Sequence, residues 1–291
     1  MLISNFNSWD KGIFSVVGKI GGPVIDDVVN TKYYYRRDDP TQWMTRTDMN
    51  IDTYGPTEIT YKFNKAGFRS DEFVDDGRDC ILSIGDSFTM CLGVPYEHTW
   101  PYILSQKIGD CKNYNLGLAS AGGDYIVRTV SKTIEVLKPK AIFILWPSFI
   151  TREIAIKNRY ITYIPTGGDF DGKIETRMPI FAEFTKLFND NSYIIYHHRK
   201  NVEMLHALCN LNKVPCQEIS MNNFNEKFEL VNIAEAELSR VFDIRNPNKK
   251  YNILGADQNF ATARDGLHFG HDWNKYISEL FYSQYLKNSQ N

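Results

Sequence analysis

The chain has few cysteines, no excess of one charge and no long apolar run. Its five cysteines are scattered, without the CxxC spacing of a zinc site or the density of a disulfide-stapled domain, which favours a reducing compartment. The 33 basic residues nearly balance 35 acidic ones, for a net charge of -2, which argues against nucleic acid as a partner. No apolar run reaches the ~18 residues of a membrane span.

The N-terminus also lacks the basic start and unbroken apolar core of a classical secretory signal. We therefore expect a cytoplasmic or virion-associated protein. No cofactor motif stands out, and the histidines and cysteines form no cluster with metal-ligand spacing, so we expect neither a cofactor nor a metal.

The 291 residues change character near residue 78. Residues 1–77 are rich in Asp, Asn, Tyr and Arg and carry several turn signals, which predicts an N-terminal extension with short strands and irregular structure. Residues 78–291 have an α/β pattern and are predicted to form one domain. Within it, the glycine-rich stretch 155–185 breaks the pattern and predicts an inserted loop or hairpin.

Apolar runs at residues 80–84 and 141–146 predict buried strands, and weaker strands are expected at 114–116 and 214–216. Helices are expected after Thr99 and over residues 124–138, 202–209, 232–242 and 272–287. Strands that alternate with helices predict a mainly parallel sheet covered on both faces.

The first buried strand runs into Gly85-Asp86-Ser87. Ligands bind at the carboxyl ends of strands in open parallel sheets, so a serine after a tight glycine turn would be exposed at the mouth of a cleft. A serine nucleophile needs a histidine within hydrogen-bond reach and a carboxylate that orients it. Asp265 and His268, just before the terminal helix, can supply both groups. Taken alone, each motif also fits an ordinary turn or helix cap.

Gly85-Asp86-Ser87-Phe88 and Asp265-Gly266-Leu267-His268 together resemble the first and last sequence blocks of the SGNH, or GDSL, hydrolases. Residues 63–73 (FNKAGFRSDEF) resemble a segment just upstream in one branch of that family. The resemblance covers roughly residues 60–291. It implies a three-layer α/β/α sandwich around an about five-stranded, flavodoxin-like sheet. Ser87 would be the nucleophile, His268 the base and Asp265 the orienting carboxylate.

The family's oxyanion hole combines the nucleophile's N–H, a glycine N–H from the second block and an Asn amide from the third. In one register Ser120 occupies the glycine position, and a two-residue shift places Gly122 there. The third block departs from the family, because Trp146-Pro147-Ser148 is followed by no Asn; Ser148 or Thr151 can donate a hydroxyl instead. Losing one donor typically lowers the rate about a hundredfold.

Trp146, Arg152 and His98 are further candidates for substrate binding, although a surface position beside a helix is the simpler interpretation of His98. His197-His198 is interpreted as a solvated helix surface rather than a metal site, because adjacent residues point to different faces of a helix.

The resemblance predicts a serine esterase acting on a small-acyl ester, above all an acetyl ester, or on a short-chain ester, with an acylated carbohydrate as the favoured substrate. Two alternatives stay open. One is a polysaccharide O-acyltransferase, in which a sugar hydroxyl replaces water. The other is a catalytically weak structural or glycan-binding protein, for example of a virion, which the missing third-block Asn and the unassigned first 77 residues motivate.

Overall fold

Two strands of six buried residues lie at the centre of the structure: β1 (Cys80–Gly85) and β3 (Ala141–Trp146). They pair in parallel, and β2 (Lys112–Asn115) and β6 (Cys216–Ser220) extend the sheet in the order β2-β1-β3-β6. A strand without an exposed residue requires cover on both faces of the sheet, which is why these two runs are continuously apolar. The parallel sheet that the sequence predicts is confirmed.

The computed structural model describes residues 59–289 apart from 60, 65, 110, 148–150, 157–158, 164–190, 221–250, 254–255, 259, 262 and 265–267. Four strands of the main sheet lie in this part of the chain. The helix predicted over 232–242 lies outside it, as does most of the predicted N-terminal extension.

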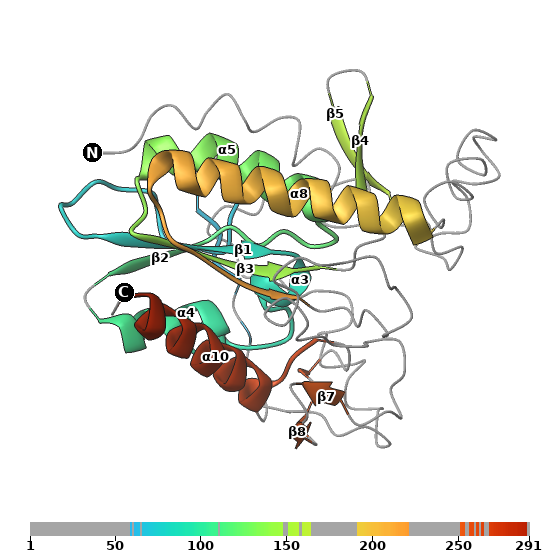
Figure 1. Ribbon diagram of the computed structural model, residues 1–291. Coiled ribbons are helices and arrows are strands. Elements are labelled where there is room, and N and C mark those ends of the chain that lie inside the picture. Colours follow the sequence, from blue (N-terminus) through green and yellow to red (C-terminus); the bar gives the residue numbers. More distant parts are fainter. Residues whose placement is uncertain are drawn as a thin grey trace.

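Helices cover both faces of the sheet and form three layers (Figure 1). On one face lie α5 (Gly123–Leu137) and α8 (Asn191–Asn212); on the other lie α4 (Trp100–Ile108) and α10 (His271–Ser289). Side chains of each strand alternate between the two resulting cores. Leu82, Ile84, Ile142, Ile144 and Trp146 pack towards α5 and α8. Ile81, Ala141, Phe143 and Leu145 pack towards α4 and α10.

The helix ends follow the sequence signals. Thr99 caps α4 by accepting a hydrogen bond from the Tyr102 amide, and Pro101 lies in the first turn, where no amide hydrogen is needed. Lys138 adopts a left-handed conformation after α5 and its amide bonds to the Ile134 carbonyl, just before Pro139. The α5 boundaries agree with the predicted 124–138 to within one residue.

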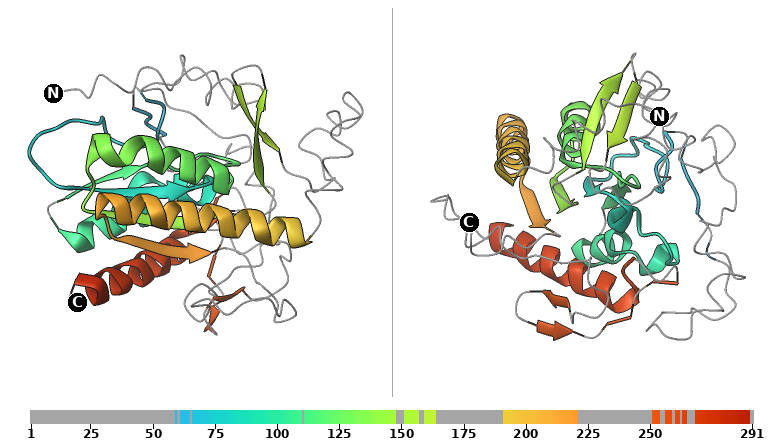
Figure 2. Two further views of the ribbon diagram at one scale, coloured as in Figure 1. Left: turned by 45° about the horizontal axis from the view of Figure 1, so that its top comes forward. Right: turned by 90° about the vertical axis from the view of Figure 1, so that its right-hand side faces the viewer.

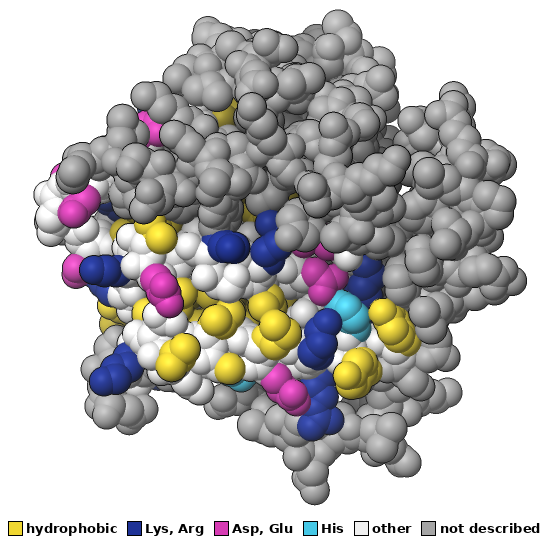
Figure 3. Space-filling view, turned by 90° about the horizontal axis from the view of Figure 1, so that it is seen from above, with side chains coloured by type: hydrophobic (Ala, Val, Ile, Leu, Met, Phe, Trp, Pro, Cys, Tyr) yellow, Lys and Arg dark blue, Asp and Glu magenta, His cyan; other side chains and the backbone are white. Residues whose placement is uncertain are grey.

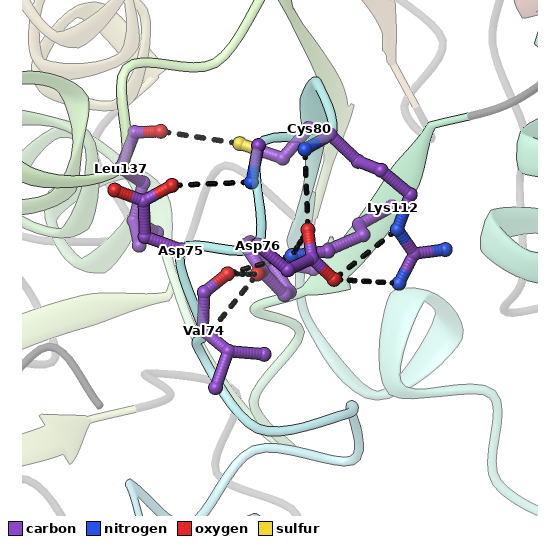
Figure 4. A network of polar contacts seen from close by, with 9 residues as sticks. Val74, Asp75, Asp76, Cys80, Lys112 and Leu137 are labelled. Atoms are coloured by element: carbon purple, nitrogen blue, oxygen red, sulfur yellow. Dashed lines mark hydrogen bonds and ion pairs between the residues drawn. The ribbon is translucent and has the colours of Figure 1, made fainter. Parts of the chain in front are cut away.

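Residues 66–73 pack into the same core as β1, although the sequence places them in an extension. Phe68 and Phe73 are nearly fully buried, and the Phe73 ring lies edge-on to Tyr114 of β2, with 4.8 Å between ring centroids. At the amino edge of the sheet the Lys112 ammonium donates to the Val74 carbonyl (2.6 Å) and pairs with Asp76 (Figure 4). These contacts join the described part of the upstream segment to the sheet.

Two small antiparallel pairs stand apart from the main sheet (Figure 2). The first is β4 (Arg152–Ile156) with β5 (Arg159–Tyr163), which overlaps the predicted insertion at 155–185. The second is β7 (Tyr251–Ile253) with β8 (Ala256–Gln258). Two short helical turns complete the described elements: α3 (Ser87–Met90) and a 3₁₀ turn at Tyr96–His98. Within the described residues, no helix has the length and apolarity to cross a membrane.

Candidate active site

The sheet order places Ser87 at a topological switch point. The chain leaves β1 to form β2 on one side of it, and then crosses to form β3 on the other side. In such sheets the crevice at the carboxyl ends of the two diverging strands is where ligands bind. Ser87 is the first residue of α3 and lies two residues beyond Gly85, the last residue of β1. The predicted nucleophile therefore occupies the position in the fold that is suited to ligand chemistry.

The turn that carries Ser87 is closely packed. A methyl group on Gly85 would lie 2.2 Å from the Thr89 hydroxyl and 2.6 Å from the Leu145 carbonyl oxygen, so only glycine fits there. The Asp86 carboxylate accepts a hydrogen bond from the Phe88 amide (2.9 Å) and caps α3. Asp86 therefore fixes the turn that carries Ser87.

His268 lies beside this turn although it is far away in the sequence. Its ring packs on Phe88, the residue after Ser87, with 4.7 Å between centroids, and Phe269 packs on Phe88 at 4.5 Å. His268 is buried, with 6% of the residue exposed, and the Ala263 amide donates to its carbonyl (2.7 Å). The first and last blocks thus meet in space.

Asp86 is an acidic neighbour of this histidine. Burial raises the pKa of the Asp86 carboxyl to about 6, whereas the hydrogen bond from the Phe88 amide and the charge of His268 act in the opposite direction. Above that pH the site holds a carboxylate in a mostly buried position next to an imidazole.

The loop after β2 forms the adjacent wall. The Leu118 amide donates to the Gly85 carbonyl (3.1 Å), and a methyl group on Gly117 would lie 2.4 Å from the Met90 amide nitrogen. Ser120 has a φ of 62°, in the left-handed region that favours glycine. Gly122 precedes α5, and a methyl group there would lie 2.5 Å from the Thr151 carbonyl oxygen. The loop after β2, which carries Ser120 and Gly122, thus meets Thr151, which follows β3, at this edge of the sheet.

The other predicted residues lie in different surroundings. Trp146 is buried on the α8 side of the sheet, where its indole N–H donates to Glu218 (2.6 Å). Arg152 is also buried; it donates to the Thr151 carbonyl (3.0 Å), and its guanidinium lies 5.7 Å from the centre of the Tyr193 ring. The His98 ring packs, tilted by 48°, against His271 at the start of α10, with 4.3 Å between centroids. Their roles in substrate binding stay predictions.

Asp265 and Ser148 lie outside the described residues, so the orienting carboxylate and one predicted oxyanion donor keep the status of predictions. Across the described ranges, no three His, Cys, Asp or Glu side chains are placed to hold a metal ion. The interpretation of His197-His198 as a solvated surface was wrong for His198. Its ring packs edge-on to Trp146 at 5.1 Å, and burial, with Arg152 and His197 adding to it, lowers the pKa to about 3.

A groove of about 520 Å³ runs along α5 and α8. Hydrophobic side chains there alternate with Lys, Arg and acidic ones on the face seen in Figure 3. It is lined by Asp124, Val127, Arg128, Ser131, Lys200, Asn201, Met204, Ala207, Leu208 and Leu211. Neither Ser87 nor His268 lines this groove, so it is distinct from the candidate active site.

Sequence reasoning assigned no role to two buried polar residues that hold the turn of Ser87. Asn115, the last residue of β2, donates to the Thr89 carbonyl (2.8 Å) and accepts from the Gly117 amide (2.9 Å). Arg69 reaches three carbonyls of the following loop. The only sequence signal for Arg69 was its place in the FNKAGFRSDEF segment.

No family model and no curated protein matches this chain. Among solved structures, a lipolytic protein of the G-D-S-L family from Desulfitobacterium hafniense DCB-2 is 13% identical over 70% of this chain and 97% of its own, with a TM-score of 0.40. A G-D-S-L lipolytic protein from Veillonella parvula DSM 2008 is 14% identical (69% and 94% covered, TM-score 0.35). A lipase/acylhydrolase from Enterococcus faecalis is 13% identical, over 71% of this chain and 94% of its own, with a TM-score of 0.31. The first two structures carry the G-D-S-L name, which is also the name of the family that the sequence resembles.

Proposed function

We propose that this chain is a serine ester hydrolase of the G-D-S-L type. The observation that carries the proposal is the meeting of two distant motifs at one edge of the sheet. Ser87 follows the central strand at the switch point, and His268 packs against the next residue, Phe88. Solved structures named as a lipolytic protein and as a lipase/acylhydrolase are consistent with the proposal.

In the proposed reaction His268 accepts the proton of the Ser87 hydroxyl as its oxygen attacks the ester carbonyl. The tetrahedral intermediate collapses, and the protonated imidazole delivers the proton to the departing alcohol. Water then attacks the acyl-serine with His268 again as the base, which releases the acid and restores the serine. By the family resemblance, Asp265 would orient the His268 imidazole in both steps of the reaction.

The developing negative charge needs backbone donors near the attacked carbonyl. We propose the amides of Ser87 and Ser120 for this role. The positive φ of Ser120 supports the register in which it stands at the family's glycine position, because a glycine is the residue that adopts this conformation without strain. Gly122 has an ordinary extended backbone, with a φ of -114°, and precedes α5 as its cap.

We further propose a small-acyl ester, such as the acetyl group of a carbohydrate, as the substrate. The test is hydrolysis of p-nitrophenyl acetate and of an acetylated glycan by wild type, Ser87→Ala and His268→Ala. We expect both variants to lose at least about a thousandfold in kcat/KM on the ester that the wild type hydrolyses. Equal rates for wild type and Ser87→Ala would refute the proposal.

A further inference from the structure

Arg69 is a buried cation whose described hydrogen-bond partners are all backbone carbonyls. It is 1% exposed, and its Nη1 donates to the carbonyls of Met90 (3.1 Å) and Cys91 (2.5 Å), while Nη2 donates to that of Val94 (2.8 Å). The guanidinium also stacks over the Tyr61 ring, 4.4 Å from its centre. Burying a charge is costly unless it is hydrogen-bonded, so these contacts are what keep the side chain inside the protein.

The carbonyls that Arg69 binds belong to the loop that leaves the turn of Ser87. The last carbonyls of a helix have no hydrogen-bond donor within the helix. At the end of α3, side chains from other segments donate to these carbonyls. Asn115 donates to the Thr89 carbonyl, and Arg69 donates to the next two. The Ser87 carbonyl accepts from the amides of Cys91 and Leu92. A shift of this loop therefore shifts the backbone of Ser87.

The same loop contacts the segment that carries His268. The Gly93 carbonyl accepts from the Arg264 amide (3.2 Å), and the Gly93 amide donates to the Tyr61 hydroxyl (2.7 Å). The Cys91 thiol donates to Asn274 of α10 (3.3 Å). Residues 90–94, here called the clamped loop, thus lie between the turn of Ser87 and the turn of His268, and Arg69 binds that loop from the upstream segment.

We propose that Arg69 is a positioning residue of the active site: by binding the carbonyls of the clamped loop, it sets the position of Ser87 relative to His268. The inference rests on the proposed esterase function. A planar guanidinium with five donors can bind three carbonyls at fixed angles, whereas a lysine ammonium is a single point of charge on a flexible stem. The role therefore requires arginine rather than any buried cation.

The test compares wild type with Arg69→Lys and Arg69→Met in ester hydrolysis and in the rate of covalent labelling by a fluorophosphonate. A misplacement of about 1 Å in reacting groups can lower a rate about a hundredfold. We expect Arg69→Met to lower kcat by about 30- to 300-fold with KM changed by less than about threefold, and Arg69→Lys to lower kcat by about five- to 20-fold. Circular dichroism and thermal unfolding give the folded fraction of each variant, and each rate is divided by that fraction.

Lys112→Met is the matched control. It also removes a nearly buried cation bound to a backbone carbonyl, but it does so at the amino edge of the sheet, beside Val74 and Asp76 (Figure 4). We expect this variant to lose stability and to keep the kcat of wild type per folded molecule. If Arg69→Met does not fold, Arg69→Lys is compared with Lys112→Met in its place.

Three outcomes separate the proposals. Wild type that neither hydrolyses esters nor takes up the label at Ser87 overturns the esterase function, and this inference with it. A labelled wild type whose folded Arg69 variants keep its kcat overturns the role of Arg69 alone. An equal loss of kcat in Lys112→Met also overturns that role, because the effect would then be one of general stability.

Discussion

At the scale of single residues, Asp86 combines a useful hydrogen bond with an unfavourable charge. Its carboxylate caps α3 through the Phe88 amide, yet burial raises its pKa to about 6. The folded state therefore binds more protons than the unfolded state between about pH 4 and 6. Stability contributed by this group is present at low pH and falls as the pH rises through that window.

Asp86→Asn keeps an acceptor for the Phe88 amide and removes the charge. We expect the variant to be more stable than wild type above pH 6, on the order of 2 kcal/mol, and the difference to vanish below about pH 4. Urea unfolding at a series of pH values measures this.

Asp76→Asn is the control with the opposite sign. Arg78 and Lys112 hold the pKa of Asp76 below its usual range, so its contribution to stability is present above about pH 4 and is lost as the pH falls. That variant should be less stable than wild type at neutral pH. A pH-independent effect of Asp86→Asn would contradict the electrostatic account of Asp86.

At the scale of elements, the close approach of the loop after β2 to α3 aligns the second block with the first. Gly117 makes this approach possible, since a methyl group there would lie 2.4 Å from the Met90 amide nitrogen and 2.7 Å from the Thr89 carbonyl carbon. Both neighbours are backbone, which cannot move aside as a flexible side chain can.

We expect Gly117→Ala to cost about 1–3 kcal/mol of stability and to lower ester hydrolysis by more than the loss of folded protein explains. Gly77→Ala is the control, because Gly77 has a positive φ of 81° but open space around it. That variant should cost about 1 kcal/mol and leave the rate per folded molecule unchanged. Equal kinetic effects of the two changes would show that the loop does not need this approach.

The elements that the sequence predicted best are those with local signals. The apolar runs of β1 and β3, the periodicity of α5 and the Thr99 cap each depend on neighbouring residues, and all were predicted closely. The start of β6 was placed at Val214, two residues before the strand begins. The hydrogen bonds from Arg69 to Met90, from Asn115 to Thr89 and from Trp146 to Glu218 could not be predicted. These partners lie 21 or more residues apart in the sequence, and no local pattern encodes such a pair. The site was predicted through motif resemblance rather than periodicity.

At the scale of the whole molecule, Asn274 links α10 to the layer beneath the candidate site. It is fully buried and accepts from the Trp100 amide (2.9 Å) and the Cys91 thiol. Its amide nitrogen donates to the carbonyls of Phe269 and Gly270, next to His268. One side chain thus joins α10, the start of α4, the clamped loop and the histidine segment.

Asn274→Ala leaves the buried Trp100 amide without its acceptor. We expect a loss of about 2–3 kcal/mol in the free energy of unfolding, measured in urea. Ser283→Ala, which removes an exposed hydroxyl bonded within α10, should cost less than about 0.5 kcal/mol. A similar loss in both variants would mean that Asn274 has no linking role.

The proposed function depends above all on Ser87 being an activated nucleophile. The most direct test is to treat the folded protein with a fluorophosphonate and to locate the adduct by peptide mass spectrometry. We predict a single phosphonylated peptide containing Ser87, no adduct in Ser87→Ala, and strongly slowed labelling in His268→Ala. A folded wild type that carries no adduct at Ser87, or an adduct that persists in Ser87→Ala, would contradict the account.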